Sequence, residues 1–165
     1  MLETDMNCYY GWNKDISVLK DSASGGIFSA IAETILSQKG VVFGAAIDCE
    51  TSTVRHIPVE TAEQLSLLRR SKYQQSNTEA AFHQVAEALS GHRRVLFSGT
   101  PCQVAGLKCY LSIKRISTED LFTVEVLCHG VTNTKVVQSY IRSIEAKYKR
   151  KVVDLTIILF FYNLS

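Results

Sequence analysis

The feature that most constrains the fold is a repeated alternation of amphipathic segments with short apolar runs. Between residues 79 and 159, segments with helical periodicity are followed in turn by runs typical of buried strands. Such alternation is typical of parallel strands joined by right-handed helical crossovers. Upstream, residues 41–47 and 53–59 predict an antiparallel hairpin across a polar turn. The sequence therefore predicts an α/β fold with a mixed, mostly parallel sheet and flanking helices.

The other boundaries follow from apolar periodicity and turn residues. Helices are expected over 24–40, 62–69, 79–91, 101–111 and 134–149, and the later strands over 94–99, 121–130 and 152–159. A βα pattern that stops on an uncovered strand looks unfinished, so we expect an incomplete C-terminal part. A boundary near residue 78 would divide the chain into two α/β subdomains, residues 1–78 and a truncated 79–165.

Composition and cysteine count exclude several classes of protein. The net charge of +2 is near neutral and gives no strong electrostatic footprint for nucleic acid. The start of the chain lacks the pattern of a secretory signal, and the apolar run at 155–162 is too short to cross a bilayer. We therefore expect a cytoplasmic protein without a membrane span. Five cysteines with no C-x-x-C pair argue against a disulfide framework or a local zinc site.

The stretch FSGTPCQVAGL places a cysteine at a strand–helix junction. Thr100 suits the N-cap, Pro101 the first helical position and Gln103 the third, a combination that forms a capping box. Cys102 is therefore expected in the first turn of the helix. Unpaired N–H groups and the helix dipole favour an anion there, so the position suits a nucleophile or a metal ligand.

A second cysteine ends the following strand. Because neighbouring parallel strands bring their C-terminal ends to one edge of a sheet, Cys102 and Cys128 are expected at the same edge. Location alone leaves two interpretations open for both residues, a ligand and a small buried hydrophobe. For Cys8, Cys49 and Cys109 the buried-hydrophobe interpretation is preferred.

The helix start in DSASGGIFSA is a candidate anion site. Ser24 is expected to cap the helix, and Gly25 and Gly26 to leave its first N–H groups uncovered. Exposed amides of this kind bind phosphate groups. An ordinary serine cap followed by two flexible residues explains the same letters, and without further context it is the preferred interpretation.

The polar loop RRSKYQQS, residues 69–76, is the third candidate segment. It combines three positive charges with the ring of Tyr73. A loop of this composition suits an anionic, planar cofactor held by charge and stacking. Charged residues are equally common in a solvated connection, so this signal is weak when taken alone.

Taken together and in this order, the motifs resemble the coenzyme F-420 (F420) hydrogenase/dehydrogenase beta subunit family. The resemblance rests on SASGGIFSA, GVVFGAA, LRRSKYQQS, VLFSGTPCQVAGLK and CHGV, and covers residues 8–155. That family consists of flavin and iron–sulfur oxidoreductase subunits. Its members bind FAD, commonly with a 4Fe–4S cluster, and pass electrons between the flavin and a partner, which in some members is the deazaflavin coenzyme.

The resemblance implies a cofactor site and a cluster site. The implied cofactor-binding residues are Ser24, Gly25, Gly26, Lys72, Tyr73, Ser76, Gly99 and Thr100. Lys72 is the candidate for a positive charge beside the flavin ring, where it would raise the reduction potential. Cys102 and Cys128 become candidate cluster ligands. Because such a cluster normally needs four cysteines, the ligand set is incomplete in this chain.

The sequence thus predicts a flavin-dependent oxidoreductase subunit whose N-terminal subdomain, residues 1–78, binds FAD. The expected partner is a redox protein or a deazaflavin coenzyme, and we expect an oligomer or a subunit of a complex. No residue is assigned as catalytic. Two alternatives remain: a non-catalytic fragment that keeps only a nucleotide- or partner-binding surface, and a thiol enzyme that uses Cys102 as its nucleophile.

Overall fold

A computed structural model describes residues 7–152 of the chain. Its elements alternate as the apolar pattern predicts, and they build one four-stranded sheet with helices on both faces. In chain order the elements are α1 (Ile16–Lys20), α2 (Ile27–Ser37), β1 (Val41–Asp48), β2 (Thr53–Val59), the 3-10 helix η1 (Glu63–Leu67), α3 (Glu79–Ser90), β3 (Val95–Gly99), α4 (Pro101–Ile113), β4 (Leu121–Glu125) and α5 (Thr134–Tyr148).

The sheet has the strand order β2-β1-β3-β4. The first two strands form the expected antiparallel hairpin, in which Ala45 faces His56. β3 lies parallel to both β1 and β4, and its last residue, Gly99, is paired with Glu125. The predicted α/β fold with a mixed, mostly parallel sheet is therefore confirmed, and the C-terminal ends of β1, β3 and β4 point in one direction.

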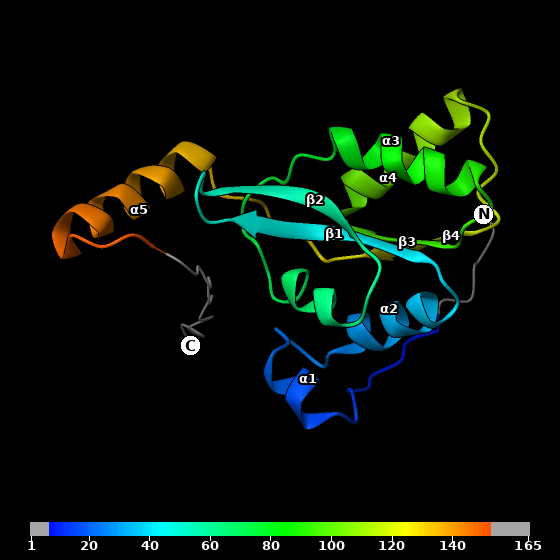
Figure 1. The fold of residues 1–165 in the computed structure, drawn as a ribbon, viewed down its shortest axis with the longest axis horizontal. Coiled ribbons are helices and arrows are strands. Elements are labelled where there is room, and N and C mark those ends of the chain that lie inside the picture. Colours follow the sequence, from blue (N-terminus) through cyan, green and yellow to red (C-terminus); the bar gives the residue numbers. More distant parts are fainter. Residues whose placement is uncertain (1–6, 153–165) are drawn as a thin grey trace.

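Two apolar layers lie on opposite faces of this sheet. Alternate strand residues point to opposite sides, so Phe43 and Phe97 pack against α3 and α4. Their neighbours Val42 and Leu96 pack against α2 and the η1 segment on the other face. Figure 1 shows α3 and α4 on one side of the strands and α1 and α2 on the other. The centre of the sheet is fully buried, which gives its strand ends a rigid base.

The C-terminal helix lies apart from these layers. Figure 1 shows α5 beyond the tip of the β1–β2 hairpin. The amide Nε2 of Gln138 donates a hydrogen bond to the carbonyl oxygen of Thr51 in the hairpin turn, at 3.0 Å. Between residues 7 and 152, no helix combines the length and apolar character that a bilayer crossing requires.

Several boundaries differ from the sequence-based expectation. The short helix expected over 62–69 is a 3-10 helix, and the strand expected over 121–130 ends at Glu125. Helix α1 was not predicted, because it has only five residues; its signal is Asp15, whose carboxylate accepts from the N–H groups of Ser17 and Val18.

Two further expectations concern the organisation of the chain. Apart from its first residue, the strand predicted over 152–159 lies outside the described residues. The sheet contains strands from both sides of residue 78, and the proposed division into subdomains 1–78 and 79–165 stays a prediction.

Candidate functional site

The two candidate ligand cysteines lie at the same edge of the sheet. Gly99 and Glu125 are paired across β3 and β4, and Cys102 and Cys128 each follow three residues later. Both are exposed. Cys128 lies beyond the end of β4 and not at its last residue, because the strand stops earlier than predicted. Among residues 7–152, no group of three or more histidine, cysteine or acidic side chains is placed to hold a metal ion.

The strand–helix junction at Cys102 has the predicted form. α4 begins at Pro101 with Thr100 as its N-cap, and the Thr100–Gln103 pair forms a capping box. The backbone N–H of Thr100 donates to Oε1 of Gln103 at 3.0 Å. The hydroxyl oxygen of Thr100 lies 3.1 Å from Sγ of Cys102. The first turn of α4 is therefore fixed by its own sequence, and it presents the cysteine at the surface.

A buried polar network lies directly beneath this turn. Nε2 of Gln103 donates to the hydroxyl of Ser76 at 2.8 Å. That hydroxyl lies 2.9 Å from Nδ1 of His56, and Nε2 of the same imidazole lies 2.8 Å from the carbonyl oxygen of Ser98. Because a carbonyl can only accept, Nε2 carries the proton and Nδ1 accepts from Ser76. We call His56, Ser76, Ser98 and Gln103 the buried network.

His56 is a functional candidate that the sequence reasoning missed. Its ring is 4% exposed and stacks on Phe97, with centroids 4.9 Å apart and an angle of 11° between the planes. Burial lowers the pKa of His56, and its hydrogen bond to the Ser98 carbonyl opposes this effect only in part. The available signal was position: His56 shares an inward-facing strand register with Val54.

The glycine turn before α2 differs from the expectation. Gly26, and not Ser24, is the N-cap, with a positive φ of 70°, and no side chain among the described residues caps the helix. Ser24 is exposed. The N–H of Asn13 donates to the carbonyl of Gly25 at 2.7 Å, and a Cβ on Gly25 would lie 2.5 Å from the carbonyl oxygen of Gly11. Close chain packing therefore explains Gly25 and the positive φ explains Gly26, and their contact with a cofactor stays a prediction.

The basic loop lies against the first turn of α2. Nε of Arg69 donates to the hydroxyl of Ser29 at 3.2 Å, and its Nη1 lies 3.3 Å from Asp21. Arg70 forms a second ion pair with Asp21 at 2.7 Å. These contacts bring together two segments that are some forty residues apart and that the resemblance assigned to one cofactor site. We call Asp21, Ser29, Arg69, Arg70 and Lys72 the charged cluster.

Lys72 closes the end of the 3-10 helix. Its ammonium donates to the carbonyl oxygen of Leu67 at 3.1 Å and also to that of Arg69. Burial lowers the pKa of Lys72 to about 8, the positive charge of Arg70 adds to this effect, and Asp21 opposes it. An anion bound beside Lys72 would raise its pKa again, because the anion stabilises the charged ammonium.

The residues after Lys72 turn toward the segment that follows Cys128. The carbonyl of Tyr73 accepts from the N–H of Thr132 at 2.8 Å, and Gln74 forms an isolated bridge with Thr132. The Gln74 amide is buried and has no hydrogen-bond partner among the described residues. Tyr73 is partly exposed. Two predicted site segments, 72–76 and the region after β4, therefore adjoin.

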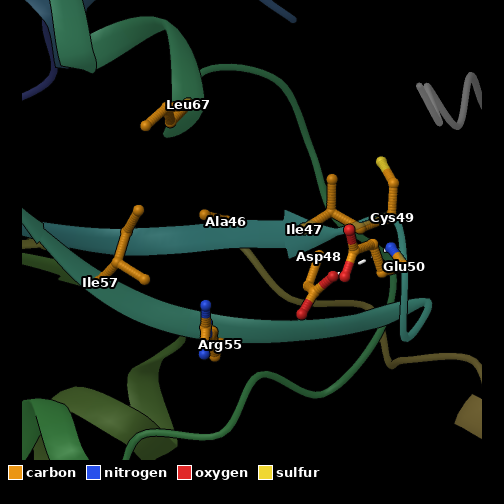
Figure 2. Close-up of a pocket in the computed structure, with 8 residues that line it drawn as sticks. All are labelled: Ala46, Ile47, Asp48, Cys49, Glu50, Arg55, Ile57 and Leu67. Carbon is orange, nitrogen blue, oxygen red and sulfur yellow. Dashed lines mark hydrogen bonds between the residues drawn. The ribbon is translucent and has the colours of Figure 1, made fainter. Parts of the chain in front are cut away.

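A pocket of about 430 Å³ lies at the hairpin end of β1. Figure 2 shows the side chains of Asp48, Glu50 and Arg55 around it, with Leu67 on the opposite side. None of the predicted cofactor or metal residues lines this pocket. Two carboxylates against one guanidinium disfavour a phosphate group by repulsion. The hairpin pocket is therefore a poor candidate for an anionic dinucleotide.

The remaining cysteines correct one interpretation. Cys8 and Cys109 are exposed and Cys49 is partly exposed, so the expectation that these three residues are buried hydrophobes is wrong. Cys109 lies on α4 away from its buried stripe of Val104, Leu107 and Leu111, and Cys49 belongs to the hairpin turn.

Comparison with known proteins gives a match to one family model over part of the chain and a likeness in fold to a solved structure. Residues 92–162 match a family model that describes the C terminus of the beta subunit of coenzyme F420 hydrogenase/dehydrogenase. A chain of the F420-reducing NiFe hydrogenase complex from Methanosarcina barkeri has a similar structure, with a TM-score of 0.62 and 21% sequence identity. The match covers 83% of the present chain and 50% of the hydrogenase chain. A comparison with curated proteins gives no match.

Proposed function

We propose that the chain is an FAD-binding oxidoreductase subunit, because residues 92–162 match the family model for the C terminus of the coenzyme F420 hydrogenase/dehydrogenase beta subunit. The chain spans half the length of the hydrogenase chain that it matches. We therefore propose flavin binding as the activity of this chain itself. Electron exchange with a redox protein or a deazaflavin coenzyme is the second part of the proposal.

The observation that carries the proposal is the contact between Arg69 and Ser29. It joins the first turn of α2, which no side chain among the described residues caps, to a loop that contributes three cations. A helix N-terminus beside cations is a favourable place for a diphosphate, because both the amides and the charges stabilise it. The chemistry of this set fits the pyrophosphate of FAD, whereas the hairpin pocket with its carboxylates does not.

The proposed roles follow from this placement. Arg69, Arg70 and the Ser24–Gly26 turn would receive the pyrophosphate, and Tyr73 would offer a ring face. Lys72 would lie beside the flavin ring, where a positive charge stabilises the reduced, anionic form. When bound, FAD supplies the redox chemistry. The chain's own contribution is to hold the cofactor, to neutralise its charge and to tune its potential.

The proposal for an iron–sulfur cluster is limited to two ligands. Cys102 and Cys128 share one sheet edge and are both exposed, so they suit two ligands of an iron–sulfur cluster. A cluster with four thiolates does not fit the described residues alone, because no third ligand adjoins this pair. We therefore derive no electron-transfer step through a cluster.

A titration with FAD tests the proposed function. Purified protein should quench FAD fluorescence and, after gel filtration, retain absorption bands at about 370 and 450 nm. Arg69→Gln should weaken binding, because it removes both a cation and the link to α2. The matched control is Arg93→Gln, which removes an exposed ion pair with Glu60 far from the α2 start in sequence. Equal FAD affinity in both variants, or no retained flavin in the wild type, would reject the proposal.

The non-catalytic alternative also has an observation in its favour. The segment after β4 exposes Leu127 (89%) and α5 exposes Tyr140 (64%), which is typical of a surface that a partner covers. This alternative predicts FAD binding without reduction by any physiological electron donor. Reduction of bound flavin by a redox protein or by reduced deazaflavin, at a rate above that of free FAD, would exclude it.

A further inference from the structure

We propose that His56 and Gln103 are positioning residues of the cofactor site, which hold Ser76 inward and so fix residues 73–76 against the Gly99–Thr100 turn. The inference rests on the proposed function as far as FAD is concerned. It assigns a role to His56, which the motifs did not single out, and a second role to Gln103 beyond its capping box. It also changes the role of Ser76 from a cofactor contact to a structural link.

The Ser76 hydroxyl makes its hydrogen bonds within the protein. Its side chain is 7% exposed, and its hydroxyl donates to Nδ1 of His56 at 2.9 Å while accepting from Nε2 of Gln103 at 2.8 Å. The single hydroxyl proton is therefore used within the protein. A direct hydrogen bond from Ser76 to a cofactor would break the bond to His56 and leave a buried acceptor without a partner.

The buried network joins separate parts of the fold. His56 belongs to β2, yet its ring passes over Ala45 of β1 and reaches the carbonyl of Ser98 in β3. The small side chain of Ala45 leaves room for this crossing. Gln103 continues the connection, since its Oε1 accepts from the N–H of Thr100. Hydrogen-bonding groups from β2, the loop, β3 and α4 thus meet at one point.

The buried network connects two segments of the proposed cofactor site. Residues 72–76 carry Lys72 and Tyr73, and the turn at 99–102 carries Thr100 and Cys102. Backbone bonds between Asn77 and β2 hold the far end of the loop. Nε2 of Gln103 lies 2.8 Å from the Ser76 hydroxyl and 3.4 Å from the Ser76 carbonyl oxygen, so the hydroxyl is the shorter tie between the loop and α4. Without the hydroxyl, the loop would keep only the longer bond to Gln103 and lose its bond to His56, and the relative position of the two segments would be less fixed.

The test compares three network variants with a matched control. His56→Phe keeps a ring stacked on Phe97 and removes both imidazole hydrogen bonds; Gln103→Met keeps the side-chain length; Ser76→Ala removes only the hydroxyl. Val85→Ala is the control, because it removes core volume in α3 without touching the network. FAD affinity is measured at a temperature where all variants are folded, beside their melting temperatures.

The expected result is a parallel loss of FAD affinity, about tenfold, in all three network variants. Val85→Ala should melt at a lower temperature and bind FAD as the wild type does. If Ser76→Ala alone weakens binding, Ser76 contacts the cofactor and the proposal is overturned. It is also overturned if affinity follows melting temperature in all four variants.

A second measurement keeps the positioning claim separate from the proposed function. If the wild type binds no FAD, the proposed function fails, and amide hydrogen exchange of the free protein decides the inference. His56→Phe should then accelerate exchange in residues 73–77 and 99–103 relative to Val85→Ala. Unchanged exchange in these two segments would reject the role of His56.

Discussion

The buried network and the charged cluster both join distant segments, but they do so by opposite means. The network is neutral, enclosed and hydrogen-bonded at each heteroatom of the His56 ring. The charged cluster is ionic and half-exposed, with the Asp21 side chain at 35% exposure between two guanidinium groups. Neutral buried bonds fix geometry, because leaving any of them unmade is costly. Exposed ion pairs contribute little to stability and remain open to exchange with another anion. The difference suggests a division of roles, in which the buried network positions the loop and the charged cluster binds the anionic cofactor.

The largest expected effect comes from the ring that supports the network. Phe97→Ala removes a fully buried side chain that stacks on His56, and it should lower the free energy of unfolding by about 3–5 kcal/mol. Chemical denaturation measures this loss. Phe122→Ala on β4, where the side chain is exposed, is the matched variant and should cost about 1 kcal/mol or less. Equal losses would show that the two strands are equally well buried in solution.

Removing one hydroxyl from the network should have a smaller but distinct effect. Ser76→Ala leaves Nδ1 of His56 without a partner and leaves Nε2 of Gln103 only its longer bond to the Ser76 carbonyl, so we expect a loss of about 1–3 kcal/mol in the free energy of unfolding. The same change at the exposed Ser37, whose hydroxyl bonds only within α2, should be nearly neutral. A loss below that of Ser37→Ala would break the contrast between buried and exposed polar groups.

The charged cluster should reveal itself through pH and not through stability. Lys72 has a pKa of about 8, so it is charged at pH 7 and largely neutral at pH 9. If it holds an anionic cofactor, FAD affinity should fall by about tenfold between pH 7 and pH 10. Lys72→Arg should keep its affinity over this range, since arginine stays charged. A titration series in both proteins checks this, and identical pH profiles would remove Lys72 from the site.

The buried network should have its own pH dependence, at the acidic side. The folded-state pKa of His56 lies below its ordinary value of 6.5. As the pH falls below 6.5, the unfolded chain takes up a proton that the folded chain does not, so the free energy of unfolding decreases. The contribution is fully present above this pH and is lost as the pH falls toward the folded-state pKa. His56→Phe should flatten that part of the curve, and an unchanged slope would contradict a buried neutral imidazole.

The smallest expected effect concerns Asp21. Asp21→Asn removes the anion that Arg69 and Arg70 share, and the change in the free energy of unfolding should be about 1 kcal/mol or less. FAD affinity should rise by about two- to fivefold, because the cations lose a competing carboxylate. Fluorescence titration at low salt measures this gain. Weaker binding in Asp21→Asn would show that Asp21 orients the arginines for the cofactor instead of competing with it.

Local sequence predicted one part of this molecule well and the other part poorly. The junction at Thr100 is specified by neighbouring residues, so its cap and the place of Cys102 followed from the sequence alone. The turn at Ser24 is different: the N-cap is Gly26, and the turn packs on residues 11–13, a contact that the local sequence does not indicate. The network was equally out of reach: nothing near His56 in the chain indicates that Ser76 and Gln103 will meet it. Periodicity predicts which face a residue takes, and only the packed fold decides its partners.

The central claim is that FAD binds along residues 69–76, which contact the start of α2 through Arg69 and helix α4 through Ser76. Amide hydrogen exchange with and without FAD tests it most directly. We predict slower exchange on FAD addition in residues 24–29, 72–76 and 99–102, with little change in the hairpin turn at 48–52. Slower exchange confined to that hairpin, or no change in any segment at saturating FAD, would contradict the claim.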